Sequence, residues 1–312
     1  MLTPLLIIVR AVHIGVLVLL AGIFAFNLVM LAPTRRFGTD DFHEIERRLF
    51  RLALWSLVAA LFSALLWFWL EVADMSGLAL KNAFSATACR TVLFDTQFGR
   101  VWQLRLALIA AAFVLVGVVL AKAKARRALA PVVWLVSVVF LVSPAWISHA
   151  AAARAQPLGL LGDALHLCAA GSWIGGLIPL AMFLTYARES VSLGEKAALV
   201  VSRYSTLSLC CVGALVVSGI SNAWLLVGSI SALFTTHYGE LLLLKMALFG
   251  ILVGFGARNR SIVRTRLAKA PSNADLLSEL RRNVIWEACL GAAVVAIVAC
   301  LGVTPPAVQA LS

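Results

Sequence analysis

Eight apolar runs, each long enough to cross a lipid bilayer, constrain the fold of this 312-residue chain more than any other feature. The hydrocarbon core of a membrane is about 30 Å thick, and an α-helix of about 20 residues crosses it. The polar stretches between the runs are too short to bury a core of their own. We therefore expect an all-α integral membrane protein with eight transmembrane helices, in which the first run lacks the basic start of a signal peptide and is kept as a helix. The runs are residues 4–32, 52–70, 101–121, 131–148, 158–186, 207–227, 241–257 and 284–303.

Basic residues predict how the chain is oriented in the membrane. Nineteen of the 26 lysine and arginine residues fall in the loops that follow the first, third, fifth and seventh runs, and only four fall in the loops on the other side. Loops rich in lysine and arginine stay in the cytoplasm, so we expect both termini to be periplasmic. These residues lie beside apolar helices without interleaved aromatic residues, which indicates contact with the lipid bilayer and no nucleic-acid partner.

Two pairs of matching segments suggest an internal repeat. Residues 96–108 and 236–248 share Thr, any residue, an aromatic residue and Gly, and then, after five residues, a basic residue, any residue and Ala-Leu. His13 and His166 each follow an alanine and an aliphatic residue, and each precedes a glycine by nine positions, Gly22 and Gly175. We expect one membrane domain built from two parallel four-helix halves, residues 1–150 and 151–312, with the two histidines at the same depth.

Four of the five histidines are expected near the periplasmic face, where they form a candidate metal site. Imidazole nitrogen binds copper, zinc, iron and nickel. Asp163 lies three residues before His166 on the same helix face, where its carboxylate serves as a metal ligand or orients the imidazole from behind. Asp163 as a helix cap and His166 as a plain hydrogen-bonding group stay open as alternatives. The predicted metal-binding residues are His13, His149, His166, Asp163 and, with less support, His237.

His43 is the one histidine expected on the cytoplasmic side, and its acidic surroundings are typical of a solvated loop. On the helix of His166, Trp173 lies on the same face as the histidine. Small residues nearby, including Gly175 and Gly176, should let a neighbouring helix approach closely.

Charged and aromatic residues within the runs add further expectations. Arg10 lies three residues before His13, where its positive charge would oppose a bound cation. Arg105 and Lys245 match each other in the repeat, and we expect them to extend toward the outer face or to pair with Glu71, Asp163 or Glu240. Aromatic residues near the ends of the runs are expected in interfacial belts; these are Trp102, Trp134, Trp146 and Tyr238.

Residues along nearly the whole chain resemble the copper resistance protein D family (CopD/PcoD) of bacterial inner membranes. The resemblance implies copper homeostasis or resistance, with copper ions carried or held by His13, His149 and His166. It also implies a separate small periplasmic copper-binding protein as partner, because this chain lacks the fused domain of some relatives. The matching segments are Ala11-Val12-His13, Trp146-Ile-Ser-His149, His166 to Gly176, Leu242-Leu-Leu-Lys245, Arg258-Asn259-Arg260 and Arg281-Arg282-Asn283-Val284 with Glu287.

The residues themselves leave the identity of the metal open between copper and zinc, since cysteine and methionine form no thiol or thioether ladder. No nucleophile elbow, zinc-protease, phosphate-loop or dinucleotide motif is present, so we do not expect an enzyme. Two alternatives remain. One is a b-type haem protein with His13 and His166 as axial ligands, and the other is a scaffold whose histidines only form polar bonds.

Overall fold

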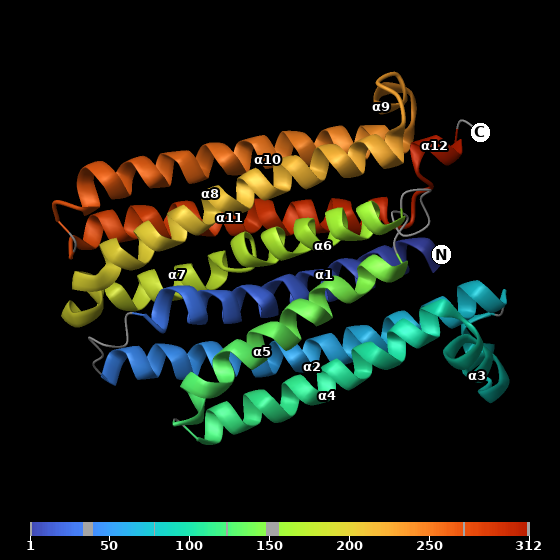
Figure 1. The fold of residues 1–312 in the computed structure, drawn as a ribbon, viewed down its shortest axis with the longest axis horizontal. Helices are drawn as coiled ribbons and strands as arrows, with labels where there is room; N and C mark the ends of the chain where they lie inside the picture. Colours follow the sequence, from blue (N-terminus) through green and yellow to red (C-terminus); the bar gives the residue numbers. More distant parts are fainter. Residues whose placement is uncertain are drawn as a thin grey trace.

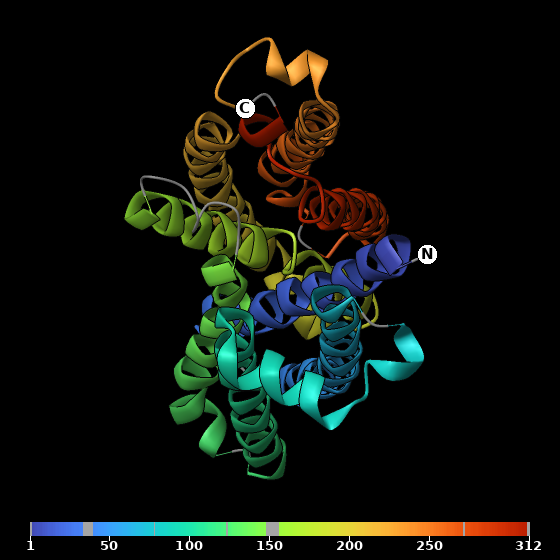
Figure 2. The same cartoon turned by 90° about the vertical axis from the view of Figure 1, so that its right-hand side faces the viewer.

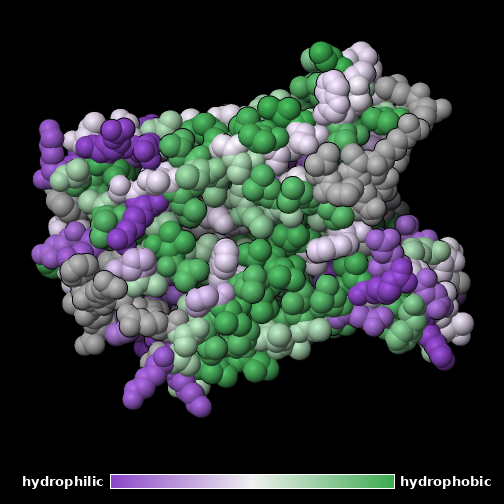
Figure 3. Space-filling model, viewed as in Figure 1, coloured by the Kyte–Doolittle hydropathy of each residue, from purple (hydrophilic) through white to green (hydrophobic). Residues whose placement is uncertain are grey.

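The computed structural model describes residues 2–33, 40–77, 79–122, 124–147, 156–270 and 272–310. These residues form a bundle of long helices without a β-strand (Figure 1). All eight expected runs lie in helical spans that are long and apolar enough to cross a membrane, which confirms the predicted fold class. On the face seen in Figure 3, apolar side chains cover the middle of the bundle and hydrophilic side chains gather at its two ends, as a bilayer-embedded bundle requires.

The helices extend beyond the apolar runs that predicted them. Helices α2 and α8 each have 37 residues, because helix-favouring polar residues continue each helix past the stretch that hydropathy detects. The long helices are α1 (Leu2–Phe26), α2 (Asp40–Ser76), α4 (Gln97–Ala121), α5 (Ala125–Val142), α6 (Gln156–Trp173), α7 (Leu177–Ala187), α8 (Val191–Val227), α10 (His237–Ile262) and α11 (Ala274–Leu301). Short helices are α3 (Ala86–Asp95), α9 (Ala232–Thr235) and α12 (Ala307–Ala310), and π-helical turns Asn27–Leu31 and Val263–Leu267 extend α1 and α10.

The two ends of the bundle differ in what they carry. Both termini and the short helices α3, α9 and α12 lie at one end, which we call the terminal end (Figure 1). The other end holds the C-terminal ends of α1, α4, α7 and α10 and the N-terminal ends of α2, α5, α8 and α11. Because these helix ends and the sequence between them contain the excess of lysine and arginine, we call it the basic end. Its assignment to the cytoplasm stays a prediction.

Helix α1 is the centre of the packing. It contacts α2 and α5 on one side and α6, α7 and α11 on the other. In the view along the bundle, α2, α4 and α5 lie below α1, and α8, α10 and α11 lie above it (Figure 2). Most contacts between the N-terminal and C-terminal helices therefore pass through α1.

The fifth apolar run is not one continuous helix, because α6 ends at Trp173 and α7 begins at Leu177. The break lies where the chain crosses α1. A Cβ atom on Gly22 would overlap the backbone of Gly175 and Gly176, and a Cβ on Gly175 would overlap the carbonyl of Val18. The expected close approach of helices at these glycines is confirmed, since backbone touches backbone there.

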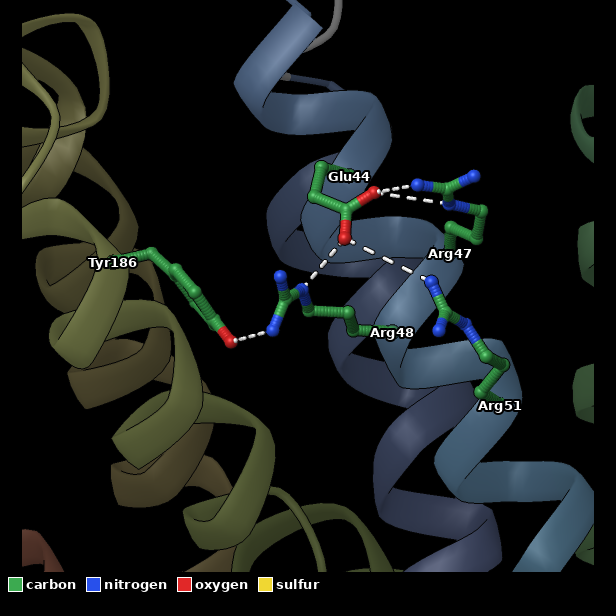
Figure 4. Close-up of polar contacts among 5 residues, drawn as sticks. All are labelled: Glu44, Arg47, Arg48, Arg51 and Tyr186. Carbon is green, nitrogen blue, oxygen red and sulfur yellow. Dashed lines mark hydrogen bonds and ion pairs between the residues drawn. The ribbon is translucent and has the colours of Figure 1, made fainter.

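Polar contacts also join the two sets of helices at the basic end. Glu44 of α2 accepts hydrogen bonds from Arg47 and Arg48, and Arg51 lies 3.8 Å from the same carboxylate (Figure 4). Arg48 reaches across to the hydroxyl of Tyr186 on α7, at 2.5 Å. Such exposed pairs stabilise little individually, but they connect α2 to α7.

Candidate metal site

His13 lies on α1 with its side chain fully buried. Its Nδ1 atom is 2.8 Å from the hydroxyl oxygen of Ser63 on α2, and that hydroxyl donates its proton to the carbonyl of Ala59 at 2.7 Å. A hydroxyl has only one proton to give, so Ser63 must accept from Nδ1–H. The lone pair of His13 is therefore on Nε2.

The Nε2 atom of His13 is already occupied by Arg105 of α4, whose guanidinium hydrogen-bonds to it. The guanidinium lies over the rings of Trp67, Trp102 and Phe140, with its carbon 4.9, 5.0 and 5.9 Å from their centroids. Two of its nitrogens, Nε and Nη1, have no hydrogen-bond partner, so cation–π attraction holds this charge. The nitrogen of His13 that could bind a metal is thus bonded to the positively charged side chain of Arg105.

The buried positions of Arg105 and Trp102 correct two expectations. Each side chain is only 1% exposed, so Arg105 does not extend toward the outer face and Trp102 does not belong to an interfacial belt. Tyr238 is also buried, whereas Trp146 is exposed as expected. The position of a residue along an apolar run gives its depth in the membrane, but its direction depends on which helices pack beside it.

A second guanidinium lies beside the first. Arg10 stacks on the ring of Trp67 at 5.0 Å. The carboxylate of Glu71 accepts a hydrogen bond from the indole nitrogen of Trp67 at 3.0 Å and interacts electrostatically with Arg10. Arg10, Arg105 and Glu71 therefore all lie against Trp67, whose ring is next to His13, and together they carry a net positive charge.

His166 of α6 repeats the hydrogen bonding of His13 in different surroundings. Its Nδ1 atom is 3.0 Å from the hydroxyl oxygen of Ser218 on α8, and Ser218 donates to the carbonyl of Ala214 at 2.6 Å. By the same reasoning, the lone pair is on Nε2. The side chain is partly buried, and within the described part of the chain no hydrogen bond to Nε2 is formed.

The charges around His166 balance, whereas those around His13 are positive in sum. Asp163 accepts a hydrogen bond from the Asn222 amide of α8 at 2.7 Å. Lys245 of α10 interacts electrostatically with both Asp163 and His166. One carboxylate and one ammonium thus flank this histidine. Asp163 is not a helix cap, since α6 begins at Gln156.

The two matched sequence segments make the same local contacts. Thr96 and Thr236 each accept a hydrogen bond from a glycine amide, Gly99 at 3.0 Å and Gly239 at 3.1 Å. A Cβ on either glycine would overlap the backbone of the short helix before it. The shared threonine and glycine therefore make the same tight turn into α4 and into α10.

The other predicted site residues are placed as follows. His149 lies outside the described residues. His237 is the first residue of α10 and not a loop residue, and its side chain is 73% exposed, with Nδ1 3.5 Å from the Glu240 carboxylate. His43 is 62% exposed at the start of α2. Among the described residues, no three histidine, cysteine, aspartate or glutamate side chains lie together as metal ligands.

Sequence reasoning missed the two serines that orient the histidines. Ser63 lies 50 residues after His13, and Ser218 lies 52 residues after His166. A comparison of the two halves at nearly equal spacing would have found both. Trp67 and Asn222, each four residues after its serine, were missed for the same reason.

An axial haem ligand would need a free Nε2 facing open space. The Nε2 of His13 instead bonds to Arg105, and three aromatic rings enclose the imidazole, with ring centroids 5.5, 6.4 and 6.1 Å away. Nothing in the described residues supports the haem alternative.

Comparison with known proteins identifies relatives along the whole chain. Residues 1–160 match the family model described as "Copper resistance protein D-like, N-terminal domain", and residues 198–301 match "Copper resistance protein D". The chain is 27% identical over 301 residues to "Inner membrane protein YebZ" of Escherichia coli, covering 95% of this chain and 97% of the relative. No solved structure matches the chain significantly.

Two further relatives are named for copper. "Copper transport protein CutJ" of Bacillus subtilis is 29% identical over 236 residues, which are 70% of this chain but only 42% of that protein. "Copper resistance protein D" of Pseudomonas syringae pv. tomato is 27% identical over 223 residues, 69% of this chain and 71% of the relative. None of these names describes an enzyme.

Proposed function

The chain belongs to the copper resistance protein D family and is a multi-pass inner-membrane protein, and from this premise we propose that it binds copper ions at a histidine site near the periplasmic face. Copper is the cargo, which the protein transports inward or holds. A separate small periplasmic copper-binding protein delivers the ion. Family membership supports a role in copper homeostasis, and the chemistry of the site comes from the side chains.

The arrangement of His166 carries this proposal. Ser218 keeps the proton on Nδ1, which leaves the Nε2 lone pair for a metal. Asp163 lies one turn away on the same face and supplies negative charge for a cation. Neither feature requires the helices to move before an ion can bind.

We propose His149, from the chain before α6, as a further ligand. His237, at the start of α10, is the fourth residue proposed for the site. Its high exposure leaves it free to turn toward an incoming ion.

His13 does not share in this first binding event, because Arg105 already occupies its Nε2 atom. It would become a ligand only if the guanidinium left the aromatic rings. One copper ion per chain, bound in the C-terminal half, is the stoichiometry that follows.

Copper titration of the purified protein tests this assignment. His166→Ala should abolish the stoichiometric site, and Asp163→Asn should weaken it on the order of 10- to 100-fold, as loss of a supporting group does. His43→Ala is the matched control, because it removes an exposed histidine at the basic end. Unchanged copper affinity in His166→Ala would overturn the proposed site. Copper uptake into proteoliposomes then separates carrying from holding, since a variant with His13, His149 and His166 all changed to alanine should lose any uptake.

A further inference from the structure

Glu287 is a carboxyl group inside the membrane-spanning part of α11, and its side chain is only 3% exposed. Its Oε1 accepts a hydrogen bond from the amide of Asn259 on α10. The Asn259 amide oxygen in turn accepts from Asn283, one turn earlier on α11, at 2.8 Å. Both asparagine side chains are neutral. A carboxylate buried with neutral partners is costly unless it takes up a proton or a cation.

The charged groups near Glu287 are committed to other partners. Arg260, which lines the same cavity, donates to the hydroxyl of Ser205 at 3.0 Å. The Tyr204 hydroxyl of α8 interacts electrostatically with Glu287 but donates to the carbonyl of Trp173 at 2.5 Å. On α7 the titratable group is Tyr186, which binds Arg48. On α1, His13 is bonded to Arg105, and Arg10 lies against Gly302 at the far end of α11.

A cavity of about 150 Å³ lies beside this carboxyl, between α7, α8, α10 and α11. Its walls are mostly apolar, with Glu287, Asn259, Tyr204 and Ser208 among the polar groups. A water molecule takes about 30 Å³ of liquid volume and needs two to four polar partners, and this space meets both conditions. Water in it would connect Glu287 to the Arg260 side of the bundle, near the basic end.

The same cavity lies closer to the basic end than His166 does. Trp173 forms part of its lining and ends α6, seven residues after His166, a rise of about 10 Å along a helix. The matching helix of the N-terminal half, α5, contains no acidic residue, and the buried Glu46 of that half lies 4.0 Å from the guanidinium of Arg126. The half of the protein that offers His166 and Asp163 to a cation is therefore also the half with a buried carboxyl whose hydrogen-bond partner is neutral.

We propose that Glu287 is a proton-binding site and that its proton exchanges through this cavity with the basic end. A proton and a copper ion arriving from His166 compete for the same carboxylate, so copper movement through the bundle is coupled to protons. This coupling rests on the proposed function. The proton site itself does not depend on it.

Dicyclohexylcarbodiimide tests the proton site without copper, because it modifies protonated carboxyl groups in apolar surroundings. Purified protein treated at several pH values and analysed by peptide mass spectrometry should show modification at Glu287 that declines as the pH rises. Glu279, on the same helix but paired with Arg258 and Arg266, is the internal control and should remain unmodified. Absence of modification at Glu287, or modification equal to that of Glu279, would overturn the proton site.

Glu287→Gln tests the coupling, since glutamine keeps an oxygen for the Asn259 amide but cannot exchange a proton. In proteoliposomes, an imposed pH gradient should change copper uptake by the wild type several-fold and should have no effect on Glu287→Gln. Glu279→Gln should behave as wild type, and copper titration of Glu287→Gln should still show the His166 site, which verifies folding. A wild-type response retained in Glu287→Gln would refute the coupling. If the wild-type protein binds no copper, the proposed function is refuted, whereas the carbodiimide result for the proton site still holds.

Discussion

Two residue differences separate the surroundings of His13 and His166, which have the same serine hydrogen bond. Three residues before the histidine stands Arg10 in one case and Asp163 in the other. Arg105 and Lys245 occupy matched positions in the third span of each half. Arg105 donates directly to His13, whereas Lys245 only interacts electrostatically with His166. Arginine's planar guanidinium suits a stack of aromatic rings, while a lysine ammonium is a compact charge on a flexible stem. These exchanges explain why one imidazole is sealed and the other is accessible.

Lys245→Met tests the electrostatic part of this comparison. The substitution removes a positive charge that opposes a metal ion at His166 and that neutralises Asp163, so copper affinity should rise about tenfold, equivalent to about 1.4 kcal/mol. Copper titration of the purified variant measures it, with Lys269→Met at the basic end as the control of equal charge change. Weaker binding in Lys245→Met would show that the ammonium supports the site.

At the scale of elements, the contact between α1 and the α6–α7 break determines how the two sets of helices join. Gly22 and Gly175 meet backbone to backbone, and without side chains the helices approach closely enough for many van der Waals contacts. A carbon atom added at this crossing must push the two helices apart. The packing of the whole bundle therefore depends on the absence of side chains at Gly22 and Gly175.

Gly175→Ala should destabilise the protein by about 1–3 kcal/mol, the usual cost of overpacking, or prevent assembly. Thermal unfolding in detergent measures the loss. Gly117→Ala and Gly250→Ala are matched controls, because a Cβ at either helical position meets no other atom within 4 Å. These two should be neutral or should stabilise by about 0.5–1 kcal/mol. Equal behaviour of all three variants would contradict the role assigned to the crossing.

For the whole molecule, the two-half repeat with boundaries at residues 1–150 and 151–312 stays a prediction with new support. The histidine–serine pairs and the two threonine–glycine turns recur in both sets of helices. Gly22 and Gly175, nine residues after their histidines, contact each other. Equivalent positions meet one another where a two-fold axis passes between them. An axis between α1 and the α6–α7 break would satisfy this.

Reporter fusions test the orientation of the bundle. Alkaline phosphatase, which is active only in the periplasm, should be active when fused after residue 312 or inserted in the α8–α9 turn. It should be inactive in the α4–α5 or α10–α11 connections, because their basic residues keep them in the cytoplasm. Activity in the opposite pattern would show that the protein has the opposite orientation in the membrane, with the His166 site at the cytoplasmic face.

The sequence by itself determined the eight spans, the unequal ends of the bundle, the glycine contact and the relation to a copper family. Each depends on composition, on spacing or on residue size, which are local properties of the chain. Only the tertiary structure decided that Arg105 and Trp102 point inward, that His13 and His166 bind separate serines, and that Glu287 accepts a hydrogen bond from Asn259, which itself accepts one from Asn283. Hydropathy reports how deep a residue lies in the membrane. The partner that it meets depends on how each helix is rotated and on which other helices pack against it.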